Sequence, residues 1–150
     1  MMGNGKKKIR VSEGERTAEA SGRILVVDDE PMIRATLERM LEPPHALSSA
    51  ASARQALESI GSGARFDLIL CDLMMPEMNG MDLYQALEKA CPDQARRMVF
   101  MTGGAFTSWG TEFLSSISSP QLEKPFSPAQ VRALVAKQLE SLGKSRPASD

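Results

Sequence analysis

The chain has little cysteine and histidine, two residue types that often serve as nucleophile or general base. Its 150 residues include two cysteines, Cys71 and Cys91, and a single histidine, His45. The cysteines lack CxxC spacing and no secretory signal precedes them, which favours reduced thiols in the cytoplasm. Neither residue type therefore offers an obvious catalytic centre.

Long hydrophobic runs and a strong net charge are also missing. No apolar stretch approaches the roughly 20 residues that a membrane-spanning helix needs. The formal net charge of -1 gives no electrostatic reason to expect nucleic acid or an anionic membrane as a direct partner. Hydrophobic residues make up 42% and charged residues 25%, which is ordinary for a globular protein. We therefore expect a cytoplasmic chain with room for one domain.

Polar segments bound the region in which a fold is expected. Residues 1–22 contain few large apolar side chains and no sustained period, which predicts a flexible leader or linker. Its KKK run is explained most simply as a solubilising tail. Residues 143–150, GKSRPASD, predict a disordered tail. The domain is thus expected to span residues 23–142.

Short apolar runs alternate with helical patterns across this domain. The runs are RILVV, FDLILC and RMVFM, with weaker ones at HALSSA and PQLE. The helical patterns are PMIRATLERMLE, SARQALESIGSG, MDLYQALEKA, SPAQVRALVAKQLESL and, least convincingly, TSWGTEFLSSISS, which is rich in serine. Continuous apolar strands separated by helices predict an α/β fold, a doubly wound five-stranded parallel sheet with helices on both faces.

Polar residues follow the predicted strands and would meet at one rim of the sheet. Asp28 and Asp29 follow the first strand and Asp72 ends the third, while Thr102 and Lys124 follow the fourth and fifth. Ligands of such sheets bind at the carboxyl ends of the strands. Clustered carboxylates favour a hard cation, Mg²⁺ above all, and a carboxylate can itself accept a phosphoryl group. Lysine and hydroxyl groups would then hold the remaining phosphoryl oxygens.

Other polar or sulfur-containing residues have simpler structural explanations. Glu30 is expected as a first-turn acid that favours the dipole of the following helix. Cys71 lies inside an apolar run and is expected in the core, and His45 is expected in a surface turn. We expect Met74 and Met75 to serve as loop and packing residues, since no cysteine or histidine accompanies them.

Four strings of the sequence together resemble the receiver domain of bacterial response regulators. They are ILVVDDEP, LILCDLMMPEMNGMDL, VFMTGGAF and LEKPFS, and the likeness covers roughly Arg23 to Leu142. The resemblance implies a flavodoxin-like fold that takes part in two-component signalling. Asp72 matches the phosphoacceptor, and Asp28, Asp29 and the Met74 carbonyl match the groups that hold Mg²⁺ with it. Of the adjacent acids, Asp29 is the expected direct Mg²⁺ ligand, and Asp28 is expected to act mostly through water.

The resemblance also implies how the site is used. Thr102 matches the hydroxyl that moves toward the phosphoryl group, and Lys124 matches the lysine that pairs with that group. The donor would be a histidine kinase or histidine phosphotransfer protein, and an unidentified downstream protein would read the result. Such a domain catalyses its own phosphorylation and dephosphorylation but is not a turnover enzyme. MTGGAF with LEKPF is most similar to receivers at the carboxyl end of hybrid histidine kinases, so the chain is either a stand-alone receiver or a piece of such a kinase.

One position departs from the family pattern. Gln121 stands three residues before Lys124, where the family commonly has an aromatic residue that swings inward on activation. A signal through Gln121 would have to use hydrogen bonds, and Phe106 is an alternative mobile aromatic residue.

Two other functions fit parts of the sequence. A Mg²⁺-dependent phosphatase with an aspartyl nucleophile would usually need a second acid two residues after Asp72, where this chain has Met74. A receiver fold that signals through partner binding alone would explain Gln121, but it would not explain the intact set of acids.

Overall fold

A five-stranded parallel sheet forms the centre of the molecule. The computed structural model describes residues 21–103 and 108–144. The strand order is β3 (Ala46–Ala50), β2 (Arg23–Val27), β4 (Leu68–Asp72), β5 (Met98–Gly103) and β6 (Gln121–Lys124). Every neighbouring pair is parallel. The doubly wound α/β fold expected from the sequence is therefore confirmed.

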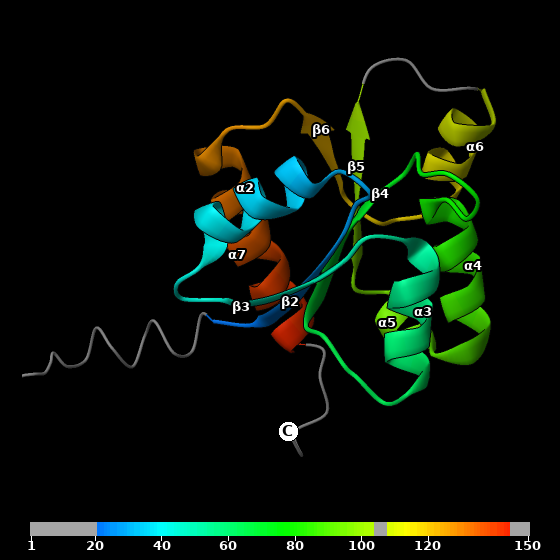
Figure 1. Cartoon of the computed structure of the whole chain (residues 1–150), viewed down its shortest axis with the longest axis horizontal. Coiled ribbons are helices and arrows are strands. Elements are labelled where there is room, and N and C mark those ends of the chain that lie inside the picture. The colour runs from blue at the N-terminus through cyan, green and yellow to red at the C-terminus, as the bar shows by residue number, and fades with distance from the viewer. Residues whose placement is uncertain (1–20, 104–107, 145–150) are drawn as a thin grey trace, which may run out of the picture.

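Helices cover both faces of this sheet (Figure 1). On one face lie α2 (Pro31–Leu41) and α7 (Pro128–Lys144). On the other lie α3 (Ala53–Gly61), α4 (Gly80–Ala90), α5 (Pro92–Ala95) and α6 (Ser108–Ser116). The short helix α5 was not predicted. The helix α6 forms despite its serines because its buried side chains, Phe113 and Leu114, pack against the second face.

The strand sequences explain the two hydrophobic cores. All five residues of β4 are buried, and so are the last four of β2, as expected for strands with helices on both sides. Because side chains alternate along a strand, neighbouring residues supply different cores. Val99 and Met101 of β5 pack toward α2 and α7, whereas Met98 and Phe100 pack toward the other helices.

The helix starts and ends follow local sequence signals. Pro31 occupies the first turn of α2, where its fixed backbone angle suits a helix start, and the helix ends before Pro43 and Pro44. At α7 the Ser127 hydroxyl accepts a hydrogen bond from the Gln130 backbone N–H, while the Gln130 side chain accepts one from the Ser127 N–H. This reciprocal cap makes Ser127 the N-cap of α7, the residue just before the first helical position.

Two local expectations need correction. Glu30 is the N-cap of α2 with an extended backbone, not a residue of its first turn, because Pro31 already occupies the first helical position. His45 does lie in the bend before β3, but it is half-buried and its Nδ1 accepts a hydrogen bond from the backbone N–H of Gly22, just before β2. Cys71 is fully buried, as predicted.

The chain ends lie mostly outside the described residues. The predicted leader and the predicted tail therefore stay predictions, except that α7 continues through Lys144, two residues past the expected boundary of the domain. Phe106 also falls outside the described residues. Within residues 21–103 and 108–144, no helix has both the length and the apolar character needed to cross a membrane.

Candidate functional site

The polar residues predicted from the strand ends do meet at one rim. Asp28 directly follows β2, and Asp72 is the last residue of the adjacent strand β4. On the next strand, Met101 is the partner of Asp72, so Thr102 lies one residue farther toward the rim. Lys124 ends β6 beside Gly103 of β5. Parallel pairing in this register brings residues from four strands to one site.

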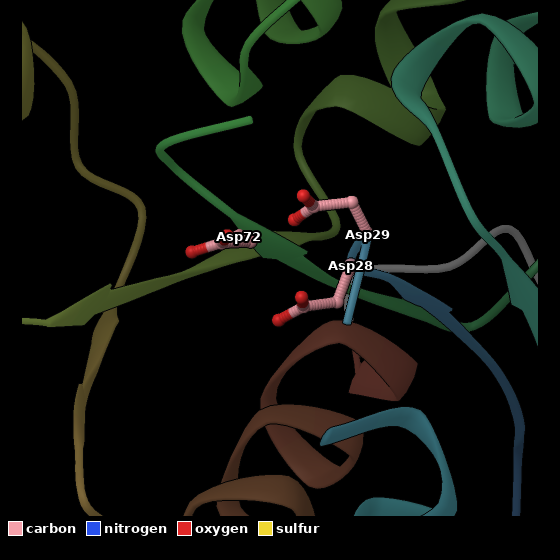
Figure 2. Close-up of side chains that lie close together, drawn as sticks. All are labelled: Asp28, Asp29 and Asp72. Carbon is pink, nitrogen blue, oxygen red and sulfur yellow. The ribbon is translucent and has the colours of Figure 1, made fainter. Parts of the chain in front are cut away.

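Three carboxylates gather at the ends of β2 and β4 (Figure 2). Asp28, Asp29 and Asp72 each offer an oxygen, and these oxygens lie within 4.8 Å of one another. Two unit charges about 4 Å apart repel by about 4 kcal/mol at an effective dielectric near 20. The arrangement is therefore costly unless a proton or a cation offsets the charge.

Asp28 is the most enclosed of the three acids. Its side chain is fully buried, its Oδ1 accepts the Glu30 backbone N–H at 2.9 Å, and its Oδ2 contacts the Lys124 ammonium at 3.1 Å. The Arg34 guanidinium donates to the Asp28 carbonyl oxygen at 2.7 Å. Asp28 is thus already held by protein groups, while Asp29 is exposed to solvent. This difference agrees with Asp29 as the more available ligand for a cation.

Lys124 reaches across the sheet to the acids. Its Nζ lies 3.1 Å from Asp28 Oδ2 and 3.4 Å from Asp72 Oδ1. Since β5 stands between β6 and β4, the lysine stem must cross β5. Burial opposes its charge, but Asp72 and Asp28 outweigh that effect and raise the pKa of Lys124. The ammonium therefore stays charged at neutral pH and bridges the two carboxylates.

Gly103 provides the passage for that stem. A Cβ at this position would lie 3.3 Å from Lys124 Cβ and 3.4 Å from Lys124 Cδ. The absence of a side chain therefore lets the lysine lie flat against β5. This role of Gly103 was not predicted from the sequence.

Asp72 is buried enough to change its acidity. The residue is 7% exposed. Burial, followed by the negative charge of Asp28, raises the pKa of Asp72 to about 6, although Lys124 acts in the opposite direction. The carboxylate is still mostly ionised at neutral pH. A nearby cation would therefore stabilise the ionised form of Asp72 more than that of an exposed aspartate.

The loop after Asp72 is held close to the acid. The Gly80 N–H donates to the Leu73 carbonyl at 3.0 Å, and a Cβ on Gly80 would lie 2.7 Å from the Asp72 carbonyl oxygen. A capping box between Asn79 and Asp82 fixes the start of α4 at this point. Glycine is therefore required where α4 meets the end of β4.

Two methionines follow Asp72 in this loop. Met75 is buried in the hydrophobic core, which confirms it as a packing residue, whereas Met74 lies in the loop with its side chain 42% exposed. Within the described part of the chain, no backbone or side-chain group donates a hydrogen bond to the Met74 carbonyl. That oxygen is thus available to another ligand.

The donor set suits a hard, oxygen-binding cation. Carboxylate and carbonyl oxygens are the ligands that Mg²⁺ prefers, and no cysteine sulfur or histidine nitrogen belongs to the acid cluster. The negative charge of Asp28 repels the ionised Asp72 carboxylate. A divalent cation bound between the two acids would offset this repulsion. The residues present therefore fit a metal ion.

Comparison with known proteins decides the family. Residues 24–136 match the response regulator receiver domain. The chain belongs to the response regulator receiver family. It is 36% identical over 127 residues to the alginate biosynthesis transcriptional regulatory protein AlgB of Pseudomonas aeruginosa, covering 84% of this chain and 28% of AlgB. It is 32% identical over 130 residues to the sensor kinase CckA of Brucella abortus, covering 84% of this chain and 14% of CckA.

Solved receivers share the fold. A CheY-like response regulator receiver domain protein from Methanospirillum hungatei superimposes with a TM-score of 0.73 at 27% identity, covering 83% of this chain and 98% of that one. By contrast, the chain spans less than a third of the curated relatives AlgB and CckA. The receiver fold is therefore shown over its full extent, whereas the activities of those larger proteins are not shown for this chain.

The receiver's site agrees with the sequence analysis in its acids and its lysine. Asp28, Asp29, Asp72 and Lys124 come together as expected, and Thr102 is buried at the adjacent strand end. Sequence reasoning missed Arg34. Its position six residues after Asp28, about one turn into the helix α2 that starts at the site, was the signal that could have revealed it.

Proposed function

We propose that this chain is a phosphoacceptor receiver of a two-component phosphorelay, with Asp72 as the phosphorylated residue. The observation that carries this proposal is the double contact of Lys124 with Asp28 and Asp72, beside a third carboxylate that completes a cation site. Receivers typically accept phosphoryl groups and are not turnover enzymes, which agrees with the family assignment. We place the reaction in the cytoplasm, which the free thiols of Cys71 and Cys91 support.

The transfer step follows from the groups at the rim. An Asp72 carboxylate oxygen attacks the phosphorus of a phosphohistidine, the phosphorus–nitrogen bond breaks, and its electron pair stays on the departing imidazole. Asp29, Asp72 and the Met74 carbonyl would hold Mg²⁺ directly, with Asp28 behind them. The metal supplies charge neutralisation for the transferring group. Lys124 then contacts a phosphoryl oxygen instead of the bare carboxylate.

Phosphorylation would shift a conformational equilibrium. The group adds about -1.5 to -2 charges if the aspartyl phosphate behaves like other phosphorylated residues. Thr102 and Lys124 can donate to the new oxygens in one conformer better than in another. Moving a population from about 1:99 to 99:1 needs about 5.5 kcal/mol. Two or three charge-assisted hydrogen bonds of about 1.5–3 kcal/mol each supply most of that difference.

Exposed methionines support a docking position for the donor protein. The exposed large apolar side chains of the described residues are Met32 on the first turn of α2 and Met74 in the loop after Asp72. Both follow acid-bearing strand ends closely in sequence. Methionine adapts its shape to different partners, so these side chains suit a docking helix that presents a phosphohistidine. The downstream protein that reads the phosphorylated state is a separate partner.

Intact-mass spectrometry after incubation with acetyl phosphate tests the proposal. We expect a Mg²⁺-dependent adduct of one phosphoryl group on the wild type, with acetate as the leaving group, and none on Asp72→Asn. Glu123→Gln removes an exposed carboxylate from the neighbourhood of the site and should be labelled like the wild type. Labelling of Asp72→Asn would contradict the assignment.

Two further results would point to the alternatives. Lack of an adduct from both acetyl phosphate and purified phosphohistidine proteins would favour a module that binds partners without phosphorylation. Steady turnover of a generic phosphomonoester would favour a phosphatase, for which Met74 occupies the position where a second acid is expected.

A further inference from the structure

Three aromatic rings pack together where β5 meets the helices α4 and α6. Tyr84 belongs to α4, Phe100 to β5 and Phe113 to α6. The ring centroids of Phe100 and Phe113 lie 5.4 Å apart, those of Tyr84 and Phe113 lie 5.6 Å apart, and those of Tyr84 and Phe100 lie 6.0 Å apart. Both contacts of Phe113 are edge-to-face, an arrangement that aromatic rings favour. We call these three residues the ring cluster.

Phe100 connects the ring cluster to the loop that carries Asp72. It is fully buried, and its Cε1 lies 3.3 Å from the position that a Cβ on Gly80 would occupy. The same Cβ would lie 2.7 Å from the Asp72 carbonyl oxygen. Phe100 therefore packs against the first residue of α4 at the point where that helix meets the end of β4.

Phe100 also shares a strand face with Thr102. Alternation along β5 places Met98 and Phe100 on the face covered by α4 and α6, so Thr102, two residues farther, lies on the same face. Movement of the Thr102 strand end toward a group on Asp72 would therefore displace the strand segment that carries Phe100. The loop after Asp72 and the strand end at Thr102 are thus both connected to the ring of Phe100.

The helix α6 receives this connection through Phe113. Its described buried side chains of large size are Phe113 and Leu114, so Phe113 is a principal anchor of the helix. On the neighbouring strand, Gln121 is the partner of Phe100, and its side chain is exposed. The residue of β6 next to Phe100 is thus not aromatic, and the aromatic ring of Phe113 that contacts Phe100 comes from α6.

We propose that the ring cluster couples phosphorylation of Asp72 to the positions of α4 and α6, with Phe100 as the positioning residue between the site and Phe113. This inference rests on the proposed function. Close-packed interiors transmit small displacements because they leave no free volume to absorb them. Phosphorylation is therefore read on the face formed by α4 and α6, and Tyr84, which is half-buried, reports the change at the surface of that face.

The composition of the chain allows a direct test. Tyr84 is the single tyrosine, so 3-fluorotyrosine incorporated into the full chain gives one ¹⁹F NMR resonance that reports on the ring cluster. The spectrum is recorded before and after incubation with acetyl phosphate and Mg²⁺, and intact mass gives the phosphorylated fraction in each sample. We expect a second Tyr84 resonance whose intensity follows that fraction.

Two leucine variants separate coupling from general packing. Phe113→Leu removes a ring of the cluster, and we expect it to be phosphorylated while its Tyr84 resonance changes by less than about half the wild-type amount. Phe66→Leu is the matched control, because Phe66 is similarly buried (5% against 8% for Phe113) but precedes β4 at the end away from the acids. The Phe66→Leu variant should show the same change in its Tyr84 resonance as the wild type. Phe113→Met is a second variant if Phe113→Leu does not fold.

The outcomes distinguish this inference from the proposed function. An adduct on Asp72 with an unchanged Tyr84 resonance in the wild type would overturn the inference and leave the proposed function intact. A full resonance change in a folded Phe113 variant would overturn it as well. Absence of an adduct on the wild type would overturn the proposed function and the inference together.

Discussion

The side chain of Lys124 lies directly on Gly103. A Cβ at residue 103 would come within 3.3 Å of Lys124 Cβ and 3.4 Å of Lys124 Cδ. The lysine needs this flat surface because its ammonium must pass over β5 to contact Asp72 and Asp28. Gly103 therefore determines where the ammonium group of Lys124 lies in the site.

We predict that Gly103→Val slows labelling of Asp72 by acetyl phosphate about 10- to 100-fold, since a charge-assisted hydrogen bond is worth about 1.5–3 kcal/mol. The valine side chain would displace the lysine stem from β5. Gly103→Ala should have a smaller effect, because a shift of a few tenths of an ångström relieves a 3.3 Å contact. The rate of adduct formation, followed by intact mass, measures both. Labelling of Gly103→Val at the wild-type rate would show that the path of Lys124 does not depend on this glycine.

Gly80→Ala should destabilise the fold by about 1–3 kcal/mol, the usual cost of overpacking a filled site. The new Cβ would lie 2.7 Å from the Asp72 carbonyl oxygen and 3.1 Å from Leu73 Cα, and these backbone atoms cannot rotate away. Urea unfolding measures the loss. Gly61→Ala is the control, because Gly61 ends α3 with no atom within 4 Å of the added Cβ. Equal stability of the two variants would contradict the prediction.

The strand ends were predictable because parallel topology converts order along the chain into position in space. Asp28, Asp72 and Lys124 each follow an apolar run, and the carboxyl ends of parallel strands share one edge of the sheet. The local strings around them were sufficient to identify the receiver family. The pair of helix-covered faces then followed from the alternation of apolar runs and helical patterns. The order of the strands was not predicted and comes from the structure.

Contacts between elements far apart in the sequence were not predictable in this way. The ring cluster joins Tyr84, Phe100 and Phe113, whose packing depends on how three elements meet. The helix α6 has a serine-rich sequence of weak helix propensity, and buried Phe113 stabilises it through tertiary contacts instead. Helix and strand propensities of the local sequence predict neither the packing of the ring cluster nor the formation of α6.

Asp72→Asn should stabilise the protein at neutral pH when divalent metal is removed with a chelator. The folded-state pKa of about 6 lies roughly 2 units above the unfolded value near 3.9, and each unit is worth about 1.36 kcal/mol. Because the folded carboxyl holds its proton more tightly, ionisation costs no stability below about pH 4 and the cost is complete above about pH 6. The asparagine variant should therefore gain up to about 3 kcal/mol at pH 7.5 and little at pH 4.

Urea unfolding at the two pH values measures this difference between Asp72→Asn and the wild type. Glu123→Gln controls for the loss of one negative charge, because Glu123 is exposed and lies outside the acid cluster. Addition of Mg²⁺ should stabilise the wild type more than the asparagine variant, since the cation offsets the repulsion that the variant lacks. A gain of equal size at pH 4 and pH 7.5 would contradict the assigned pKa shift.

His45 should make the wild type lose stability as the pH falls. Its Nδ1 accepts the Gly22 backbone N–H at 3.1 Å, which requires a neutral ring nitrogen, and burial lowers the pKa of His45. Because the folded ring binds a proton less tightly than the unfolded one, this contribution is complete above the unfolded pKa near 6.5 and declines below it. His45→Asn keeps an acceptor at a similar position without titrating, so it should lose less stability between pH 7.5 and pH 5.5.

Proton NMR can follow this residue directly, because the chain contains one histidine. The ring-proton titration of the folded protein should have a lower midpoint than that of the urea-unfolded chain. Since Gly22 leads into β2 and its carbonyl accepts the Ala46 N–H at 3.0 Å, protonation should also speed amide exchange at Gly22 and Ala46. Identical midpoints in the folded and unfolded states would show that the contact with Gly22 does not depend on the charge of His45.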